Sequence, residues 1–98
     1  MAQQETKTSV LSASGQVTLY PGKIYSITVE GAAAANTVEL RDNSTAGTGG
    51  TIIWTGDFTL TAIDTRHYSF PEGMSFTTNC YANIANATKI SCTYKDNA

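Results

Sequence analysis

Residues 23–30, KIYSITVE, decide the fold class, because apolar and polar side chains alternate along them. A period of two is the pattern of a β-strand that buries one face and exposes the other. The expected buried face carries Tyr25, Ile27 and Val29. The dipeptide Pro21-Gly22 precedes this segment and predicts a turn.

The same alternation recurs to the end of the chain, interrupted every eight to twelve residues by turn-forming residues, as is typical of sandwiches and barrels. Strands are expected at 16–20, 23–30, 37–42, 51–55, 58–62, 68–70, 74–76, 80–84 and 88–94. The alanines of segment 31–36 favour helix, but six residues between two strands are too few to nucleate one. We therefore predict an all-β chain of about nine short strands, an antiparallel β-sandwich of the jelly-roll or immunoglobulin-like kind.

The inward positions of these strands predict the hydrophobic core. They are Val17, Leu19, Tyr25, Ile27, Val29, Val38, Leu40, Ile52, Trp54, Phe58, Leu60, Phe70, Phe76, Ile84 and Ile90. Residues 1–8 show no alternation and carry the polar run Gln3, Gln4, Glu5, Thr6 and Lys7. They are expected to form a flexible N-terminal arm, and residues 9–98 a single domain.

Composition excludes several classes of partner. Only 14% of the residues are charged, the net charge is −2, and 16 Thr and 8 Ser make up about a quarter of the chain. The basic residues are scattered along the sequence, whereas nucleic-acid binding needs a clustered basic face. No segment is apolar enough for a membrane span or a signal peptide, so we expect synthesis in a cytoplasm and no membrane partner.

Candidate catalytic and metal-binding residues are few. The single histidine, His67, lies near Asp64 and Arg66, but a spacing of three puts Asp64 and His67 on opposite faces of a strand. The Gly-rich segment 47–50 is followed by a strand rather than by the helix that a phosphate loop needs, and it predicts a flexible loop. We therefore expect no enzyme activity, no metal site and no cofactor.

The two cysteines are expected to be buried. If 85–87 is a hairpin loop, Cys80 and Cys92 lie directly opposite each other and face inward. Opposite Cβ atoms are about 4.5–5.5 Å apart, whereas a disulfide favours about 3.8 Å. Reduced, structural thiols are the favoured interpretation, and a disulfide remains the alternative.

A few apolar or aromatic side chains are expected on outer faces. Ile24 and Ile53 each adjoin a residue that the alternation places inward, and Tyr20 and Tyr81 also fall on outer positions. Together they suggest a subunit interface. The alternative is that a second sheet or a loop covers them.

Two longer segments carry a resemblance. The run KIYSITVEGAAAANTVELRDNSTAGTGGTIIWTGDFTL at 23–60, followed by HYSFPEGMSFTTNCYANI at 67–84 and a final strand, resembles a family of small virion proteins of tailed bacteriophages. The resemblance covers about residues 15–95. It implies a β-sandwich component of a virion, often a head decoration or cement protein and sometimes a tail part, with no catalytic residues. The cysteines are not part of the pattern.

Two functions follow as expectations. The first is a decoration protein that binds the major capsid protein of a phage as a homotrimer, with Gln3, Gln4, Glu5, Thr6 and Lys7 gripping the shell. The second is a tail or fibre module that adheres to a glycan. Glycan-binding surfaces present exposed aromatic rings, whereas the alternation places the only tryptophan, Trp54, in the core. This favours the decoration protein. Either way, the chain is expected in the virion after synthesis in the host cytoplasm.

Overall fold

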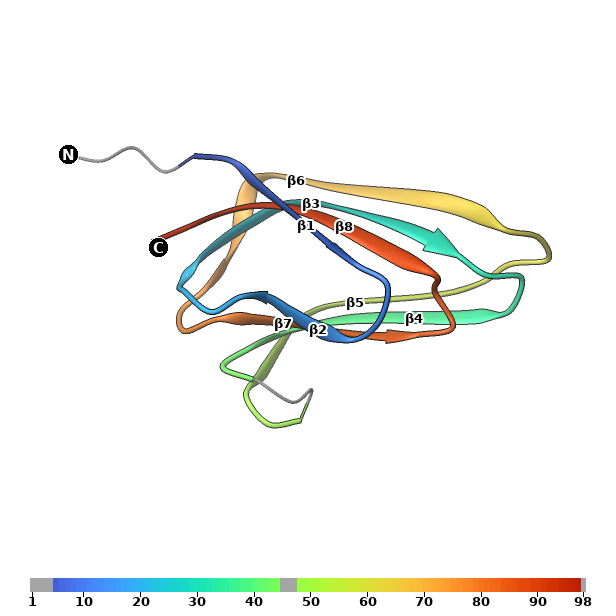
Figure 1. The fold of residues 1–98 in the computed structure, drawn as a ribbon, viewed down its shortest axis with the longest axis horizontal. Helices are drawn as coiled ribbons and strands as arrows, with labels where there is room; N and C mark the ends of the chain where they lie inside the picture. The colour runs from blue at the N-terminus through green and yellow to red at the C-terminus, as the bar shows by residue number, and fades with distance from the viewer. Residues whose placement is uncertain (1–4, 45–47, 98) are drawn as a thin grey trace.

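The chain folds into two packed antiparallel β-sheets (Figure 1), here described from a computed structural model for residues 5–44 and 48–97. It has eight strands: β1 (Lys7–Leu11), β2 (Gly15–Thr18), β3 (Gly22–Gly31), β4 (Ala35–Asp42), β5 (Thr51–Thr59), β6 (Asp64–Phe76), β7 (Cys80–Ala85) and β8 (Lys89–Asp96). Sheet A has the order β1-β8-β3-β6, and sheet B has the order β2-β7-β4-β5. The predicted all-β sandwich is confirmed.

The strand order is that of a jelly roll. Every connection between consecutive strands crosses from one sheet to the other, except the β4–β5 connection within sheet B. Eight strands wound in this way form the double-sheet arrangement that leaves only short edges open. Of the two sandwich types expected from the sequence, the jelly roll is the one observed.

Eight strands replace the predicted nine because two expected breaks are absent and one strand was missed. β5 runs unbroken through Gly56, and β6 continues through Pro71. β6 is an edge strand that pairs only with β3, where a proline without an N–H is tolerated. The missed strand is β1, in which Lys7 and Thr8 pair with Tyr94 and Thr93 of β8. The predicted arm therefore extends too far, since its last two residues belong to the sandwich.

The core lies between the two sheets. Its fully buried aliphatic side chains are Ile24, Ile27, Val29, Val38, Leu40 and Ile90. All but Ile24 were predicted from the alternation. Burying each such side chain contributes about 1.5–3 kcal/mol, so these residues are a major source of stability.

A β-bulge in β3 reverses the predicted positions of Ile24 and Tyr25. Opposite β8, Ile24 and Ser26 pair with the consecutive residues Tyr94 and Thr93, so Tyr25 is an extra residue. Ile24 and Ile27 consequently both point inward, although they are three positions apart. Ile24 is 0% exposed, and Tyr25 is only half-buried. The predictions of an outward Ile24 and a core Tyr25 are wrong.

A second bulge affects β5. Leu40 pairs with Trp54 and Arg41 with Ile52, which leaves Ile53 as the extra residue. Ile53 packs against the core while Ile52 is 47% exposed, the reverse of the prediction. Leu19, also predicted in the core, is 63% exposed because β2 ends at Thr18.

The predicted hairpin that would set the cysteines opposite each other does not form. β7 belongs to sheet B and β8 to sheet A, so the last two strands face each other across the core instead of pairing. Cys80 pairs with Asp42, and Cys92 pairs with Ile27. Both are free, fully buried thiols, and burial raises the pKa of each to about 12.

A buried carboxylate organises the turn between β6 and β7. Asp42 accepts hydrogen bonds from the Thr77 N–H (2.8 Å), the Thr77 hydroxyl (2.9 Å), the Thr78 N–H (3.0 Å) and the Asn79 N–H (3.5 Å). Burial alone would raise the pKa of Asp42, but these hydrogen bonds hold it below its ordinary value. The ionised carboxylate therefore fixes this end of the sandwich.

Two further buried side chains fix other connections. The Asn36 amide accepts a bond from the Ala32 N–H (3.0 Å) and donates to the carbonyls of Ala32 (2.9 Å) and Ala34 (2.8 Å), which holds the β3–β4 turn. Asp96, at the end of β8, accepts a hydrogen bond from the Thr18 hydroxyl and forms an ion pair with Lys7. Asp96 thus ties the last strand to both of the first two.

Candidate interaction surfaces

The four residues predicted to form a subunit interface do not lie together. Ile24 is buried, and Ile53 is half-buried and packs against the core. Tyr20 is 50% exposed in the β2–β3 connection. Tyr81 is half-buried on the outer face of sheet B, between the inward Cys80 and Ala82. Only the two tyrosines keep their predicted outward positions.

The predicted capsid-binding arm is also divided. Gln3 and Gln4 lie outside the described residues, whereas Glu5 and Thr6 are exposed. Lys7 belongs to β1, and its Nζ lies 2.7 Å from Oδ1 of Asp96. The hydrogen bond to Asp96 raises the pKa of Lys7. Lys7 therefore has a structural partner within the sandwich.

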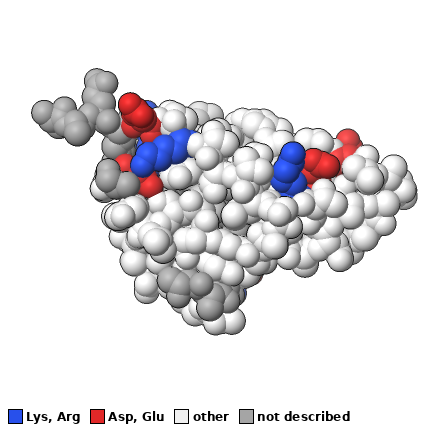
Figure 2. All heavy atoms as spheres, viewed as in Figure 1, with Lys and Arg blue, Asp and Glu red and all other residues white. Residues whose placement is uncertain are grey.

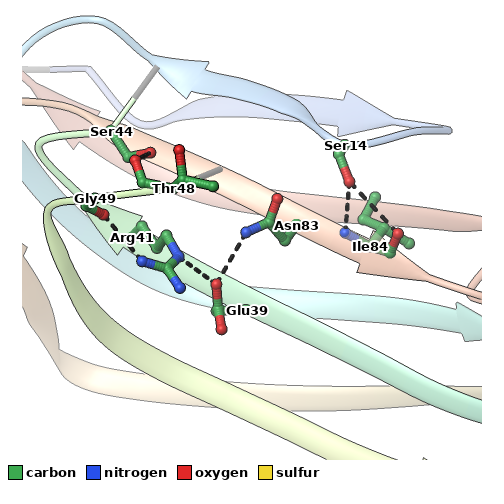
Figure 3. Close-up of polar contacts among 8 residues, drawn as sticks. All are labelled: Ser14, Glu39, Arg41, Ser44, Thr48, Gly49, Asn83 and Ile84. Atoms are coloured by element: carbon green, nitrogen blue, oxygen red, sulfur yellow. Dashed lines mark hydrogen bonds and ion pairs between the residues drawn. The ribbon is translucent and has the colours of Figure 1, made fainter. Parts of the chain in front are cut away.

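The outer face of sheet B carries a polar network (Figure 3). Glu39 and Asn83 are cross-strand partners, and Asn83 Nδ2 donates to Glu39 Oε1 at 2.9 Å. Arg41 Nε donates to the same oxygen, and Arg41 Nη1 donates to the Gly49 carbonyl at 2.9 Å. The bonds from Asn83 and then Arg41 lower the pKa of Glu39. The network joins β4, β7 and the β4–β5 loop into one rigid surface.

A second contact in Figure 3 ties the β1–β2 connection to the same sheet. Ser14 Oγ accepts a hydrogen bond from the Ile84 N–H at 2.8 Å and donates to the Ile84 carbonyl at 3.4 Å. On the far side of the network, the Ser44 hydroxyl donates to the Thr48 carbonyl at 3.1 Å. These bonds fix Ser14 and Ser44 at the two margins of the face.

Half-buried aromatic rings line the open side of the sandwich between the edge strands β5 and β6. We call them the aromatic edge: Trp54, Phe58, Tyr68 and Phe70. The Trp54 ring meets Tyr68 at 5.1 Å and Phe70 at 6.1 Å between centroids, both edge-to-face. The Arg66 guanidinium lies 5.2 Å from the centre of the Phe58 ring.

Trp54, Phe58 and Phe70 were predicted as core residues, which was correct only in part, and Tyr68 was not among the predicted core residues. The rings of the aromatic edge contact the core but remain partly exposed, because β5 and β6 each have a neighbour on one side only. The alternation along each strand shows that these residues point inward. It does not show that their strands lie at the margin of the sheets, where an inward side chain is covered on one flank alone.

The only histidine forms a hydroxyl network on the outer face of sheet A. His67 Nδ1 lies 2.7 Å from the Thr28 hydroxyl, and Nε2 lies 3.0 Å from the Ser69 hydroxyl. Asp64 is exposed and accepts a bond from the Thr65 N–H, away from the imidazole. Among residues 5–44 and 48–97, no three His, Cys, Asp or Glu side chains are grouped to hold a metal ion.

Charged groups are sparse on the surface. Figure 2 shows them gathered toward two ends of the face that it presents, with a broad uncharged area between. Two ion pairs of sheet A join Lys7 to Asp96 and Lys89 to Glu30, the second at 3.7 Å.

The described part of the chain contains no helix long and apolar enough to cross a membrane. No protein-family model matches the sequence, and no curated protein matches it either.

Proposed function

We propose that this protein is a non-enzymatic structural component of a phage virion, a head decoration protein that binds the major capsid protein as a symmetric oligomer, most simply a homotrimer. The observation that carries the proposal is the aromatic edge. Aromatic side chains are enriched at the centres of protein interfaces, where they supply much of the binding energy. A neighbouring subunit that covered this edge would complete the burial of all four rings.

The composition of the outer faces supports association through many weak contacts. On sheet A, the hydroxyls of Ser26 and Thr93 bond to each other at 2.5 Å, and Thr28 and Ser69 both bond to His67. Neutral hydroxyls that are already paired cost less to desolvate than charges do. On a lattice of identical sites, multivalency turns modest affinities into durable attachment. The jelly roll itself occurs among capsid proteins and lectins, and a fold alone does not decide function.

The test compares two charge-neutralised variants. Arg66 is exposed beside the aromatic edge, and Lys89 is exposed on sheet A, so Arg66→Gln and Lys89→Gln remove the same charge at different places. Arg66→Gln should lower both the oligomer fraction in analytical ultracentrifugation and the copy number on purified heads. Lys89→Gln should leave both unchanged. Equal behaviour of Arg66→Gln and the wild type would refute the proposed interface.

The role of the arm needs a deletion that spares β1. Removing residues 2–6 should leave the sandwich folded and reduce binding to heads. Removing Lys7 as well would cut the ion pair to Asp96 and confound the result. Likewise, an Ile53→Asp change would destabilise the monomer, because Ile53 packs against the core. Full decoration by the 2–6 deletion would contradict the docking role of the arm.

A second candidate is a tail or fibre module that binds a glycan. One observation favours it: Trp54 is not fully buried, so the main argument against an aromatic glycan platform is weakened. Locating the chain in purified particles by immunoelectron microscopy separates the two functions. Labelling confined to tails would replace the decoration role with the adhesive one.

A further inference from the structure

Two lysines that are remote in the sequence lie opposite each other on sheet A. Lys23 of β3 pairs in register with Lys95 of β8 on one side and with Ser75 of β6 on the other. Like charges directly opposite each other across two strands are destabilising. Among residues 5–44 and 48–97, neither ammonium group forms an ion pair with a carboxylate. The folded protein thus places two positively charged residues in register on neighbouring strands.

The bulge in β3 places an aromatic ring beside these charges. Tyr25 is the extra residue of the bulge, and the Lys95 ammonium lies 5.7 Å from the centre of its ring. Gly73 packs against the same group with a φ of 78°. A Cβ on Gly73 would lie 2.9 Å from Lys23 Cδ and 3.1 Å from Tyr25 Cε1. A bulge that redirects a side chain is often found beside a binding site.

A surface hollow adjoins this group. Between Ser69 and Met74, β6 departs from its pairing with β3, and the displaced segment lines a hollow of about 400 Å³. Its lining residues are Ser69, Phe70, Pro71, Glu72 and Gly73. Gly73 belongs both to the hollow and to the contact with Lys23 and Tyr25, so the two features adjoin at this residue.

We propose that this surface binds a carboxylate-bearing sugar. The ammonium groups of Lys23 and Lys95 would receive the carboxylate and relieve their mutual repulsion. The Tyr25 ring and the apolar wall of the hollow would contact the sugar ring, and nearby serine hydroxyls would bond to its hydroxyls. Glu72 also lines the hollow, so the ligand's carboxylate lies at the lysine end and its hydroxyls at the Glu72 end. Phe70 belongs both to the hollow and to the aromatic edge, so a neighbouring subunit on that edge would compete with the sugar for this ring.

The experiment titrates the ¹⁵N-labelled full chain with methyl glucuronide and, separately, with neutral methyl glucoside. Glucuronide should shift the amide signals of Lys23, Tyr25, Lys95 and segment 69–73, with a Kd on the order of 1 mM. The neutral sugar should bind about tenfold more weakly. Lys23→Gln and Lys95→Gln should each weaken glucuronide binding, and Lys89→Gln, on the same sheet, should leave it unchanged.

Stability provides a check that does not depend on the ligand. Because Lys23→Gln removes a like-charge contact, its urea midpoint should equal or exceed that of the wild type at low salt. Equal shifts with both sugars, or equal loss of binding in Lys89→Gln, would overturn the proposal. So would binding of a glutamate-rich peptide at these residues without any binding of glucuronide, which would identify the surface as a protein contact. These experiments measure sugar binding and stability, whereas the decoration role is tested by the oligomer fraction and the copy number on heads, so the two failures are distinguishable.

Discussion

Replacing Asp42 with Asn exchanges one carboxylate oxygen for an NH₂ group where four hydrogen bonds converge. Oδ2 accepts from the N–H and the hydroxyl of Thr77, and Oδ1 accepts from the N–H groups of Thr78 and Asn79. The amide of Asn keeps only one acceptor and turns a donor toward the other pair. With the NH₂ group toward Thr78 and Asn79, both of their bonds are lost; with it toward Thr77, the Thr77 N–H bond is lost and the hydroxyl must reverse and accept. In either orientation the remaining bonds lose their charge.

The magnitude follows from this count. A hydrogen bond to a charged group contributes about 1.5–3 kcal/mol net. One of the affected bonds is long, and the Thr77 and Thr78 backbones are exposed enough to recruit water, which reduces the loss. We expect Asp42→Asn to lower the free energy of unfolding by about 3 kcal/mol. With a typical slope for a chain of this length, the urea midpoint falls by about 2 M.

The effect should depend on pH with a definite sign. The folded pKa of Asp42 is lowered, while the carboxyl in the unfolded chain has a pKa of about 3.9. The stabilisation is therefore complete above about pH 4 and is lost as the pH falls through the folded pKa. The difference between wild type and Asp42→Asn should be constant near neutrality and should shrink at about pH 3.

Fluorescence of the single tryptophan, Trp54, reports unfolding in urea at pH 7 and at pH 3. Asp57→Asn is the matched control, since Asp57 is exposed on β5 and its loss should change stability by less than about 0.5 kcal/mol. If Asp42→Asn proves as stable as Asp57→Asn, the carboxylate does not organise the β6–β7 turn. An unfolding difference of equal size at both pH values would also refute the reasoning.

Three further outcomes are expected. Gly22→Ala should cost about 3 kcal/mol in urea unfolding, because its Cβ would lie 2.0 Å from a β8 carbonyl oxygen, and an unchanged midpoint would show that β8 shifts freely. Asn36→Ala should cost about 2 kcal/mol and speed amide exchange in the β3–β4 turn, whereas unchanged exchange would contradict its role as a clamp. Cys80 and Cys92 should react with a thiol reagent at pH 8 about a thousandfold more slowly than free cysteine, and two thiols should be counted in urea. Rapid labelling of either cysteine in the native protein would contradict its burial. Because the folded pKa values of the two thiols, about 12, exceed the unfolded value, the free energy of unfolding should also fall as the pH rises above about 9.

The alternation of side chains was sufficient to predict the class of fold and much of the core. Ile27, Val29, Val38 and Leu40 follow a strict period of two and are all fully buried. The errors at Tyr25 and Ile53 have one cause, which is a bulge that inserts a residue and reverses the phase of the strand. Nothing in the residue pattern around them marks the inserted position.

Pairing between strands was less predictable than the strands themselves. β7 and β8 are consecutive and separated by a short turn, which is the usual signal for a hairpin, yet each joins a different sheet. The choice depends on partners elsewhere in the chain, since β8 pairs with β1 and β3 on its two sides. For the same reason, the proximity of Lys23 and Lys95 could not be read from a list of scattered basic residues.

The pairing of β1 with β8 has a consequence for how the chain acquires its structure. Sheet A cannot be assembled until residues 89–96 are available, because β8 lies between β1 and β3. During synthesis on a ribosome, β3 would therefore wait with one edge unpaired, and its buried positions would remain open to wrong partners. Contacts between distant parts of a sequence also slow folding. We expect sheet A to form only after β8 has been synthesised, folding to be slow for a chain of this size, and aggregation to be most frequent in the interval before β8 closes the sheet.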